Sequence, residues 1–474
     1  MLSNEHYRVE TDALGDILVP STAYYGSQTQ RSVENFQISH MTLPRSFIRA
    51  QGIIKASAAA VNMELGELPE NIGQAIIDAS EEVIQGIWDD HFVVDVYQAG
   101  AGTSQNMNAN EVIGNRATEI LEQISDQPIG TYRVHPNDDV NKAQSTNDTF
   151  PSSMHIAAVE EMVNRLLPAI LDLQQELENK SQQLMPILKA GRTHLHDGVP
   201  MRLGQEFEGY AGTIQSMYTQ VEATLDSLYE LGLGGNAIGT IIHTNPQYPQ
   251  KVVEEISHRT NLPFRQPTNL FSFMQNRNAA IQTMSVLKEL AVHLIKITSD
   301  LRLLSSGPRT GLAEITLPSV QPGSTIMPGK VNPAILEMTH MVCLQVIGYE
   351  STVSAAGTWS ELEINVLMPL IAHTLLESIS IMSNAIETLT GQCIKGIEAD
   401  EKICNNWMNA SLSLVTGLNP KIGYDLASKI GMQADSENKT LTQVLQEMGL
   451  MTNELQQAID PLGLLGETKT NPTS

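Results

Sequence analysis

The most informative stretch for the fold and the binding site of this chain is Gly323-Ser-Thr-Ile-Met-Pro-Gly-Lys-Val-Asn-Pro333. It places a serine, a lysine and an asparagine in one short segment rich in glycine and proline, which are typical of tight turns. Asn332 followed by Pro333 has the sequence of a helix N-cap and first helical residue, so a helix is expected to start there. Lys330 and Asn332 beside the positive pole of that helix suit a carboxylate. We interpret the stretch as a binding loop that leads into a helix.

Long helical patterns lie on both sides of this loop. Within residues 279–305, apolar residues recur at steps of three and four, and the other long patterns show comparable spacing. Pro168 predicts a kink in the earliest of them. The expected long helices cover about 152–185, 204–231, 279–305, 333–356 and 370–391. Their length predicts a mainly α fold with a central helix bundle.

The ends of the chain have a different character. Residues 1 to about 44 are expected to be irregular, and helical patterns follow at 48–65 and 72–87. After about residue 395 the patterns shorten and are separated by glycine and proline. We therefore divide the chain into an N-terminal mainly helical domain at 1–143, a central bundle domain at 144–395 and a small helical domain at 396–474.

Composition narrows the class of protein. The 474 residues include 41% hydrophobic residues and have no apolar run as long as a membrane span. Acidic residues near the N-terminus do not fit a secretion signal, and three scattered cysteines fit free thiols, so a cytoplasmic location is expected. The net charge of −25 makes nucleic-acid binding improbable. For an anionic substrate, Lys330, Arg192 and backbone N–H groups are expected to dominate locally, because salt screens distant charges.

The loop and five further blocks resemble the aspartase/fumarase superfamily, whose members are lyases that eliminate ammonia, water or another group from a succinyl substrate. The five blocks are Tyr24-Tyr-Gly-Ser-Gln-Thr29, Gly100-Ala-Gly-Thr-Ser-Gln-Asn-Met-Asn-Ala-Asn-Glu111, Gln144-Ser-Thr-Asn-Asp148, Gly191-Arg-Thr-His194 and Leu418-Asn-Pro-Lys-Ile-Gly-Tyr424. The resemblance implies a three-domain fold, a small dicarboxylate or amino-acid substrate and no cofactor. It also implies a homotetramer in which three subunits build each active site.

The resemblance also assigns roles to particular residues. The reaction removes a proton next to a carboxylate, and Ser324 would be the base, acting as an alkoxide held by backbone N–H donors and a cation such as Lys330. Hydroxyl groups would surround the carboxylate that becomes the enediolate, and further residues would bind the other carboxylate. The first set is Thr103, Ser145 and Thr146, and the second is Thr193, Lys330 and Asn332.

His194 and Asn147 would face the leaving group, with Glu337 as the acidic partner of His194. Each has a simpler interpretation, because Asn147 fits an ordinary helix cap and Glu337 fits a solvated helix face. His196 and Asp197 lie near His194, but no third ligand with recognisable spacing accompanies them. No metal site is therefore predicted.

Two glycine clusters invite comparison with dinucleotide-binding loops. Gln105 occupies the third glycine position after Gly100 and Gly102. The second cluster, residues 232–237, follows a helical pattern instead of opening a βαβ unit. A nicotinamide cofactor is therefore improbable.

The choice between lyases depends on few positions. Ser104 and Thr146 match aspartases, as does the run 94–98, whereas His135-Pro-Asn-Asp138 and the stretch 41–50 look more like fumarases. We predict an aspartate ammonia-lyase that reversibly converts L-aspartate to fumarate and ammonia through an enediolate. The alternatives are a class II fumarate hydratase acting on fumarate and L-malate, a lyase for another succinyl substrate, and a catalytically silent helical scaffold.

Several residues depart from both groups and bear on the substrate. They are Gly239-Thr-Ile-Ile-His243, Thr325 in the signature loop, His196-Asp-Gly198, Met368 and the polar run Gln275-Asn-Arg-Asn278.

Overall fold

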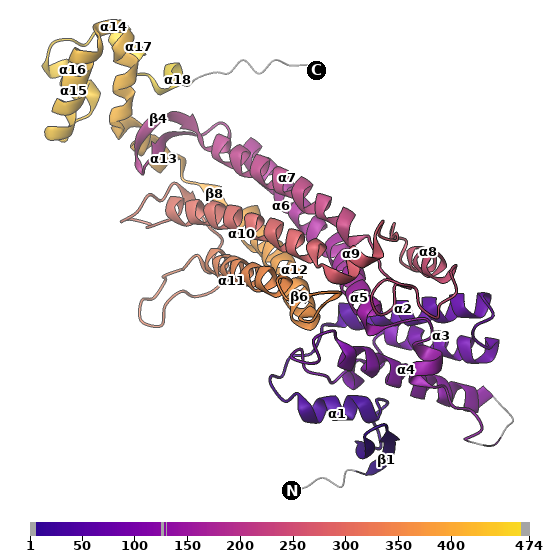
Figure 1. Ribbon diagram of the computed structural model, residues 1–474. Helices are drawn as coiled ribbons and strands as arrows, with labels where there is room; N and C mark the ends of the chain where they lie inside the picture. Colours follow the sequence, from indigo (N-terminus) through magenta and orange to yellow (C-terminus); the bar gives the residue numbers. More distant parts are fainter. Residues whose placement is uncertain (1–5, 125–127, 129, 466–474) are drawn as a thin grey trace. The chain divides into compact units, whose positions relative to one another are not determined.

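The computed structural model describes residues 6–124, 128 and 130–465. Their fold is mainly α-helical, as the periodicity predicted (Figure 1). In the described part the strands pair only in twos, all antiparallel: β1 (Tyr7–Asp12) with β2 (Gly15–Pro20), β3 (Leu188–Thr193) with β4 (His196–Arg202), β5 (Ile315–Thr316) with β8 (Glu398–Ala399), and β6 (Ser360–Glu361) with β7 (Ile364–Asn365).

The helices fall into three runs along the chain. The N-terminal run is α1 (Ser27–Asn35), α2 (Arg45–Glu64), α3 (Glu70–Ile84) and α4 (Thr103–Ile124). The middle run is α5 (Thr146–Glu161), α6 (Leu167–Leu184), α7 (Leu203–Leu228), α8 (Tyr248–Thr260), α9 (Leu270–Gln275), α10 (Asn278–Leu304), α11 (Ala334–Gly357) and α12 (Met368–Gln392). The last run is α13 (Glu401–Ala410), α14 (Asn419–Ile422), α15 (Tyr424–Ser436), α16 (Leu441–Glu447), α17 (Asn453–Ala458) and α18 (Pro461–Leu464).

Long helices dominate the middle run. α7, α10, α11 and α12 have 26, 27, 24 and 25 residues, which is about twice an ordinary globular helix. In α10 the residues that carried the predicted period are almost all buried, among them Met284, Leu287 and Leu290. The prediction of a mainly α fold built on long helices is confirmed.

The chain divides into two compact units, each made of three segments. The first unit holds residues 1–168, 217–291 and 342–384, and the second holds 169–216, 292–341 and 385–474. The five boundaries between segments fall inside α6, α7, α10, α11 and α12. The three-domain division at residues 143 and 395 stays a prediction.

The N-terminal core of the first unit lies among α2, α3 and α4 (Figure 1). α2 packs against α3, α5 and α8, and α3 packs against α4. Ile76, Val112 and Ile113 are fully buried there. In the second unit, the C-terminal helices enclose their own core around Leu418, Ile430 and Val444.

Two sequence expectations about elements were wrong. Residues before 44 are not irregular, because they form the β1–β2 hairpin and α1. α5 begins at Thr146, so Pro151 lies inside it instead of at its start. A π-helical turn at Met162–Leu166 lies directly before Pro168, which cannot supply the N–H for an ordinary helical bond to residue 164, and the predicted kink stays a prediction. Among the described residues, no helix is long and apolar enough to cross a bilayer.

Candidate active site

The predicted site residues belong to both units. Thr103, Ser145, Thr146 and Asn147 lie in the first, and Thr193, His194, Ser324, Lys330, Asn332 and Glu337 lie in the second. Each unit therefore carries part of the predicted set, and each part has its own local geometry.

Thr103 is the exposed first residue of α4, directly after a tight turn. Gly102 has φ +82°, and a Cβ there would lie 2.0 Å from the Phe150 ring. A Cβ on Gly100 would lie 1.9 Å from the carbonyl oxygen of Val366. These glycines thus permit close packing around the turn, which places the Thr103 hydroxyl at the surface.

Ser145 and Thr146 present their hydroxyls at the start of α5. Ser145 is the N-cap, and its Oγ accepts from the backbone N–H of Asn147 at 3.2 Å. Thr146 Oγ1 accepts from Asn106 Nδ2 at 3.1 Å. Because each oxygen already accepts one bond, each O–H is available to donate to an anion. This polarity fits the predicted contact with a carboxylate.

A buried lysine lies behind these hydroxyls. Lys55 Nζ donates to Asn106 Oδ1, Asn141 Oδ1 and Gln144 Oε1 at 2.9, 3.0 and 2.9 Å. Burial lowers its pKa to about 7. The lysine links the motif blocks at 100–111 and 144–148. Sequence reasoning missed it because α2 otherwise has the pattern of an ordinary apolar helix.

Asn147 is not a helix cap. It lies in the first turn of α5, and its Nδ2 donates to the carbonyl oxygen of Ala237 at 2.8 Å. The neighbouring Asp148 accepts from the backbone N–H groups of Gly234 and Asn236 at 3.1 and 2.8 Å. The glycine cluster at 232–237 therefore folds around α5 and follows α7, without the strand and helix of a dinucleotide-binding unit.

His194 occupies the tip of the β3–β4 hairpin in the second unit. His194 and Leu195 form its two-residue turn with φ +56° and +60°, the left-handed pair that a type I′ turn requires. Such angles cost non-glycine residues about 1–3 kcal/mol each and tend to persist at functional sites. Thr193 and His194 are both exposed there.

Arg192 does not supply free positive charge. Its Nη1 and Nη2 bind the carboxylate of Glu314 at 3.1 and 2.9 Å. Lys189 Nζ lies 2.9 Å from the same carboxylate, whose side chain is completely buried. The expectation that Arg192 attracts substrate was wrong, because a bidentate ion pair occupies its guanidinium.

The signature loop holds the Ser324 oxygen with backbone donors. Ser324 Oγ accepts from the N–H groups of Ile326 and Met327 at 3.2 and 2.9 Å. Two N–H donors on one hydroxyl oxygen favour its negatively charged form. Lys330 follows in the same loop with an exposed side chain. These are the kinds of groups that an alkoxide base would need.

Asn332 fixes the base of this loop. Its Nδ2 donates to the Gly323 carbonyl at 2.6 Å, and the Gly323 N–H donates to the Lys330 carbonyl at 2.7 Å. α11 begins at Ala334, so Pro333 and not Asn332 occupies the cap position. The predicted cap was wrong by one residue because the Asn332 amide bonds to the loop.

Glu337 lies in the first turn of α11, 3.8 Å from the Arg302 guanidinium through its Oε1. In the described part of the chain Glu337 forms no ion pair with His194, so their pairing stays a prediction.

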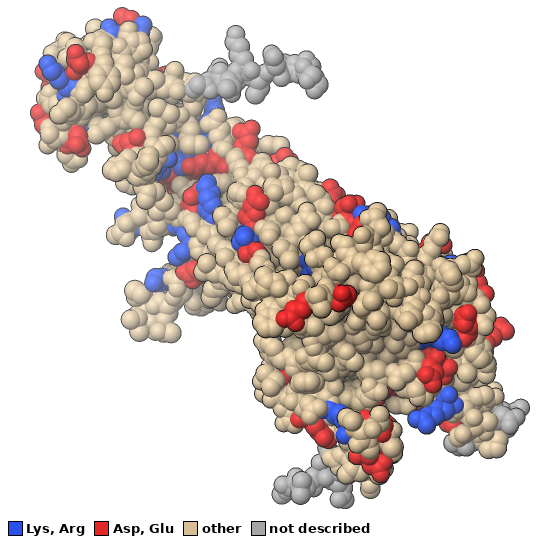
Figure 2. Space-filling view, in the orientation of Figure 1, with Lys and Arg blue, Asp and Glu red and all other residues tan. Residues whose placement is uncertain are grey.

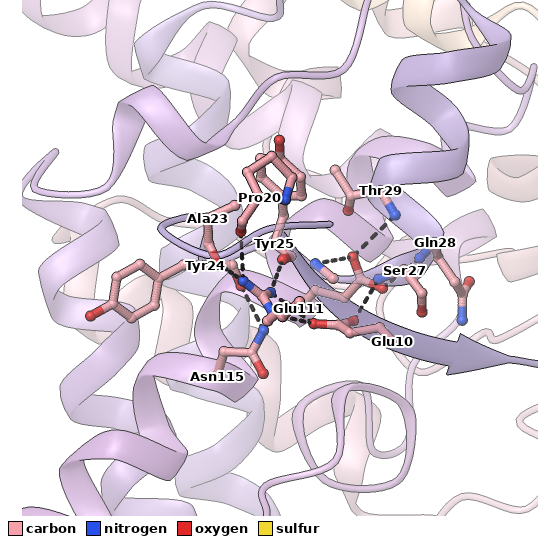
Figure 3. A network of polar contacts seen from close by, with 12 residues as sticks. Glu10, Pro20, Ala23, Tyr24, Tyr25, Ser27, Gln28, Thr29, Glu111 and Asn115 are labelled. Atoms are coloured by element: carbon pink, nitrogen blue, oxygen red, sulfur yellow. Dashed lines mark hydrogen bonds and ion pairs between the residues drawn. The ribbon is translucent and has the colours of Figure 1, made fainter. Parts of the chain in front are cut away.

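The block Tyr24–Thr29 has a structural role that sequence reasoning did not assign. The buried carboxylate of Glu111 accepts from the N–H groups of Gly26, Gln28 and Thr29 at 2.8, 2.9 and 3.1 Å, at the start of α1 (Figure 3). Glu10 accepts from the Ser27 N–H at 2.8 Å. The only sequence signal was that Glu111 closes a motif block.

The surface charge is dispersed. Figure 2 shows carboxylates scattered over the visible face, with lysines and arginines among them. In the part of the chain that the structure describes, no cluster of three or more His, Cys, Asp or Glu side chains is arranged to hold a metal ion.

Comparison with known proteins identifies the family of this chain. The Lyase family matches residues 15–348, and the family Fumarase C C-terminus matches residues 414–466. The mitochondrial fumarate hydratase of Rhizopus oryzae is 45% identical over 95% of this chain and 91% of its own length. The class II fumarate hydratase of Thermus thermophilus is 43% identical over 94% and 96%.

Two solved structures are similar to this chain over almost its full length. A fumarate lyase:delta crystallin from Brucella melitensis, crystallised with cobalt, has a TM-score of 0.91 and 42% identity, over 96% of this chain and 99% of that one. The class II fumarase of Schistosoma mansoni has a TM-score of 0.92 and 34% identity, over 96% and 98%.

These relatives show that the prediction of an aspartase was wrong, because they are fumarate hydratases and match this chain over almost its full length. Two of the features that favoured aspartase, Ser104 and Thr146, carry little weight. Ser104 is buried in α4, and Thr146 differs from serine by one methyl group, worth about 1–3 kcal/mol of discrimination. The chain belongs to the aspartase/fumarase superfamily of lyases.

Proposed function

We propose that this protein is a fumarate hydratase, which reversibly adds water to fumarate to form L-malate. The observation that carries the proposal is the 43–45% identity to fumarate hydratases over 94–95% of the chain. The local geometry supports it, because hydroxyl donors and a backbone-stabilised serine suit the elimination of water next to a carboxylate.

In the direction from malate to fumarate, Ser324 would take the proton from the carbon next to one carboxylate. The two backbone N–H groups on Ser324 Oγ support this role, because they stabilise the alkoxide. The electron pair left on that carbon moves into the carboxylate and gives an enediolate. Thr103, Ser145 and Thr146 would donate hydrogen bonds to it.

The second half of the reaction expels hydroxide, which must gain a proton to leave as water. His194 and Asn147 would face this group, with His194 as the proton donor and Glu337 as its partner. Lys330, Asn332 and Thr193 would bind the other carboxylate. Lys330 supplies the cation, and its exposed position in the loop leaves it accessible to substrate.

The proposal includes a homotetramer in the cytoplasm. In this assembly, groups from three subunits meet at each site, as the family resemblance implies. The division of the predicted residues between two units and three distant segments is in keeping with such sharing.

The test is fumarate formation, followed by ultraviolet absorbance of its double bond. Purified protein is given L-malate and L-aspartate in parallel, at equal concentration and ionic strength. We expect fumarate from L-malate and none from L-aspartate. Formation from aspartate alone, or silence with malate, would contradict the proposal.

A further inference from the structure

Arg277 is a buried cation of the first unit that the proposed reaction does not use. It lies between α9 and α10 and is only 2% exposed. It belongs to the polar run 275–278, which departs from both groups of lyases in the sequence comparison.

The partners of Arg277 leave its charge uncompensated. Its Nη2 donates to the carbonyl oxygens of Phe273 and Met274 at 3.0 and 2.5 Å, and the guanidinium lies 5.6 Å from the Phe273 ring centroid. Its Nε has no hydrogen-bond partner in the described chain. Burial alone lowers its pKa to about 9, and no carboxylate opposes this effect. Such a buried charge is costly unless something pairs with it.

A cavity of about 140 Å³ lies against this guanidinium. That volume has room for a phosphate-sized group. Asn278 and Ala279, the first residues of the 27-residue helix α10, form part of the lining. The first N–H groups of a helix have no partner within it and carry partial positive charge. The remaining polar lining includes Ser227, Thr268, Asn269, Ser272 and Asn276.

Two other ionisable side chains line the cavity. His155 is buried, and burial lowers its pKa to about 4, so the ring is neutral near pH 7. Its Nδ1 lies 2.8 Å from the carbonyl oxygen of Glu230. The Glu230 carboxylate is partly exposed and lies 3.8 Å from the guanidinium of Arg265. Arg277 is therefore the cationic side chain of the lining, and Glu230 is the acidic one.

We infer that this cavity is a binding site for a small oxyanion, for which inorganic phosphate is the probe. Two features meet in the lining of this polar cavity: a buried guanidinium without a carboxylate partner and the positive pole of a long helix. An oxyanion in this cavity would pair with the Arg277 guanidinium and accept from the helix N–H groups. This inference does not depend on which substrate the enzyme uses.

The test is calorimetric titration of the full-length protein with inorganic phosphate, with chloride holding the ionic strength constant. We expect saturable binding that Arg277→Gln weakens by about tenfold or more, because a charge-assisted contact is lost. Arg265→Gln is the matched control. It removes a nearby arginine that does not line the cavity and has Asp226 and Glu230 as partners, so it should weaken binding less than Arg277→Gln does.

A second variant guards against misfolding of Arg277→Gln. Asn276→Asp leaves the guanidinium in place and adds a negative charge to the lining, so it should also weaken phosphate binding. Phosphate binding unchanged in Asn276→Asp or in folded Arg277→Gln would overturn the inference. Wild-type protein that binds no phosphate below about 10 mM would also overturn it.

Discussion

Buried ionisable side chains in this chain are held by neighbours of different kinds. Glu314 is paired with Arg192 and Lys189, whereas Lys55 is surrounded by three amide oxygens. Burial lowers the pKa of Lys55, because three uncharged amide oxygens replace water around its ammonium only in part.

His155 should make the protein sensitive to acid. Burial lowers its pKa to about 4 from an ordinary 6.5. Between these values the unfolded chain binds a proton that the folded chain does not, so the free energy of unfolding decreases as pH falls from 6.5 toward 4. In His155→Gln this contribution disappears, and we expect a smaller loss of stability between pH 7 and pH 5. Chemical denaturation at both pH values measures it.

The matched control is His258→Gln, which replaces an exposed histidine on α8. It should keep the wild-type dependence of stability on pH. If His155→Gln and wild type lose the same stability between the two pH values, the buried neutral state of His155 is contradicted.

At the scale of elements, the turn before α4 depends on a glycine for two reasons. Gly102 combines a positive φ with a contact that leaves no room for a Cβ beside Phe150, whereas Gly66 has φ +72° and open space around it. Gly66→Ala should therefore cost about 1–2 kcal/mol, from backbone strain alone. Gly102→Ala should cost about 1–3 kcal/mol more, because the core around Phe150 must shift.

Urea denaturation of both variants measures this difference. Equal losses of unfolding free energy would show that the contact with Phe150 relaxes at no cost, and that backbone strain alone explains the glycine.

Elements with a clear apolar period could be predicted, and others could not. α10 was predictable because its buried face consists of leucines and similar apolar residues at steps of three and four. α4 was missed because Asn106, Asn108 and Asn110 are buried along it, and buried amides hide the apolar period. β1 and β2 were missed because their apolar residues Tyr7, Val9 and Leu18 are exposed, so they form no apolar core face.

At the scale of the whole molecule, the family could be predicted from motif blocks but the reaction could not. The blocks place the same hydroxyl, amide and lysine groups in aspartases and fumarases alike. The substrate therefore depends on differences as small as the methyl of Thr146, and identity along the whole chain was the better guide. The motifs did not predict the partners of Arg192 and Lys55 either, because these partners come from distant segments that only the fold brings together.

The proposed mechanism depends most directly on Ser324 as the base that starts the elimination. The decisive measurement is kcat for conversion of L-malate to fumarate by Ser324→Ala, beside Thr325→Ser in the same loop. We expect Ser324→Ala to lose about 10²–10⁴-fold while it stays folded, because general base catalysis is removed. Thr325→Ser, which exchanges an exposed residue, should stay near the wild-type rate. A Ser324→Ala enzyme that turns over malate like wild type would contradict the account.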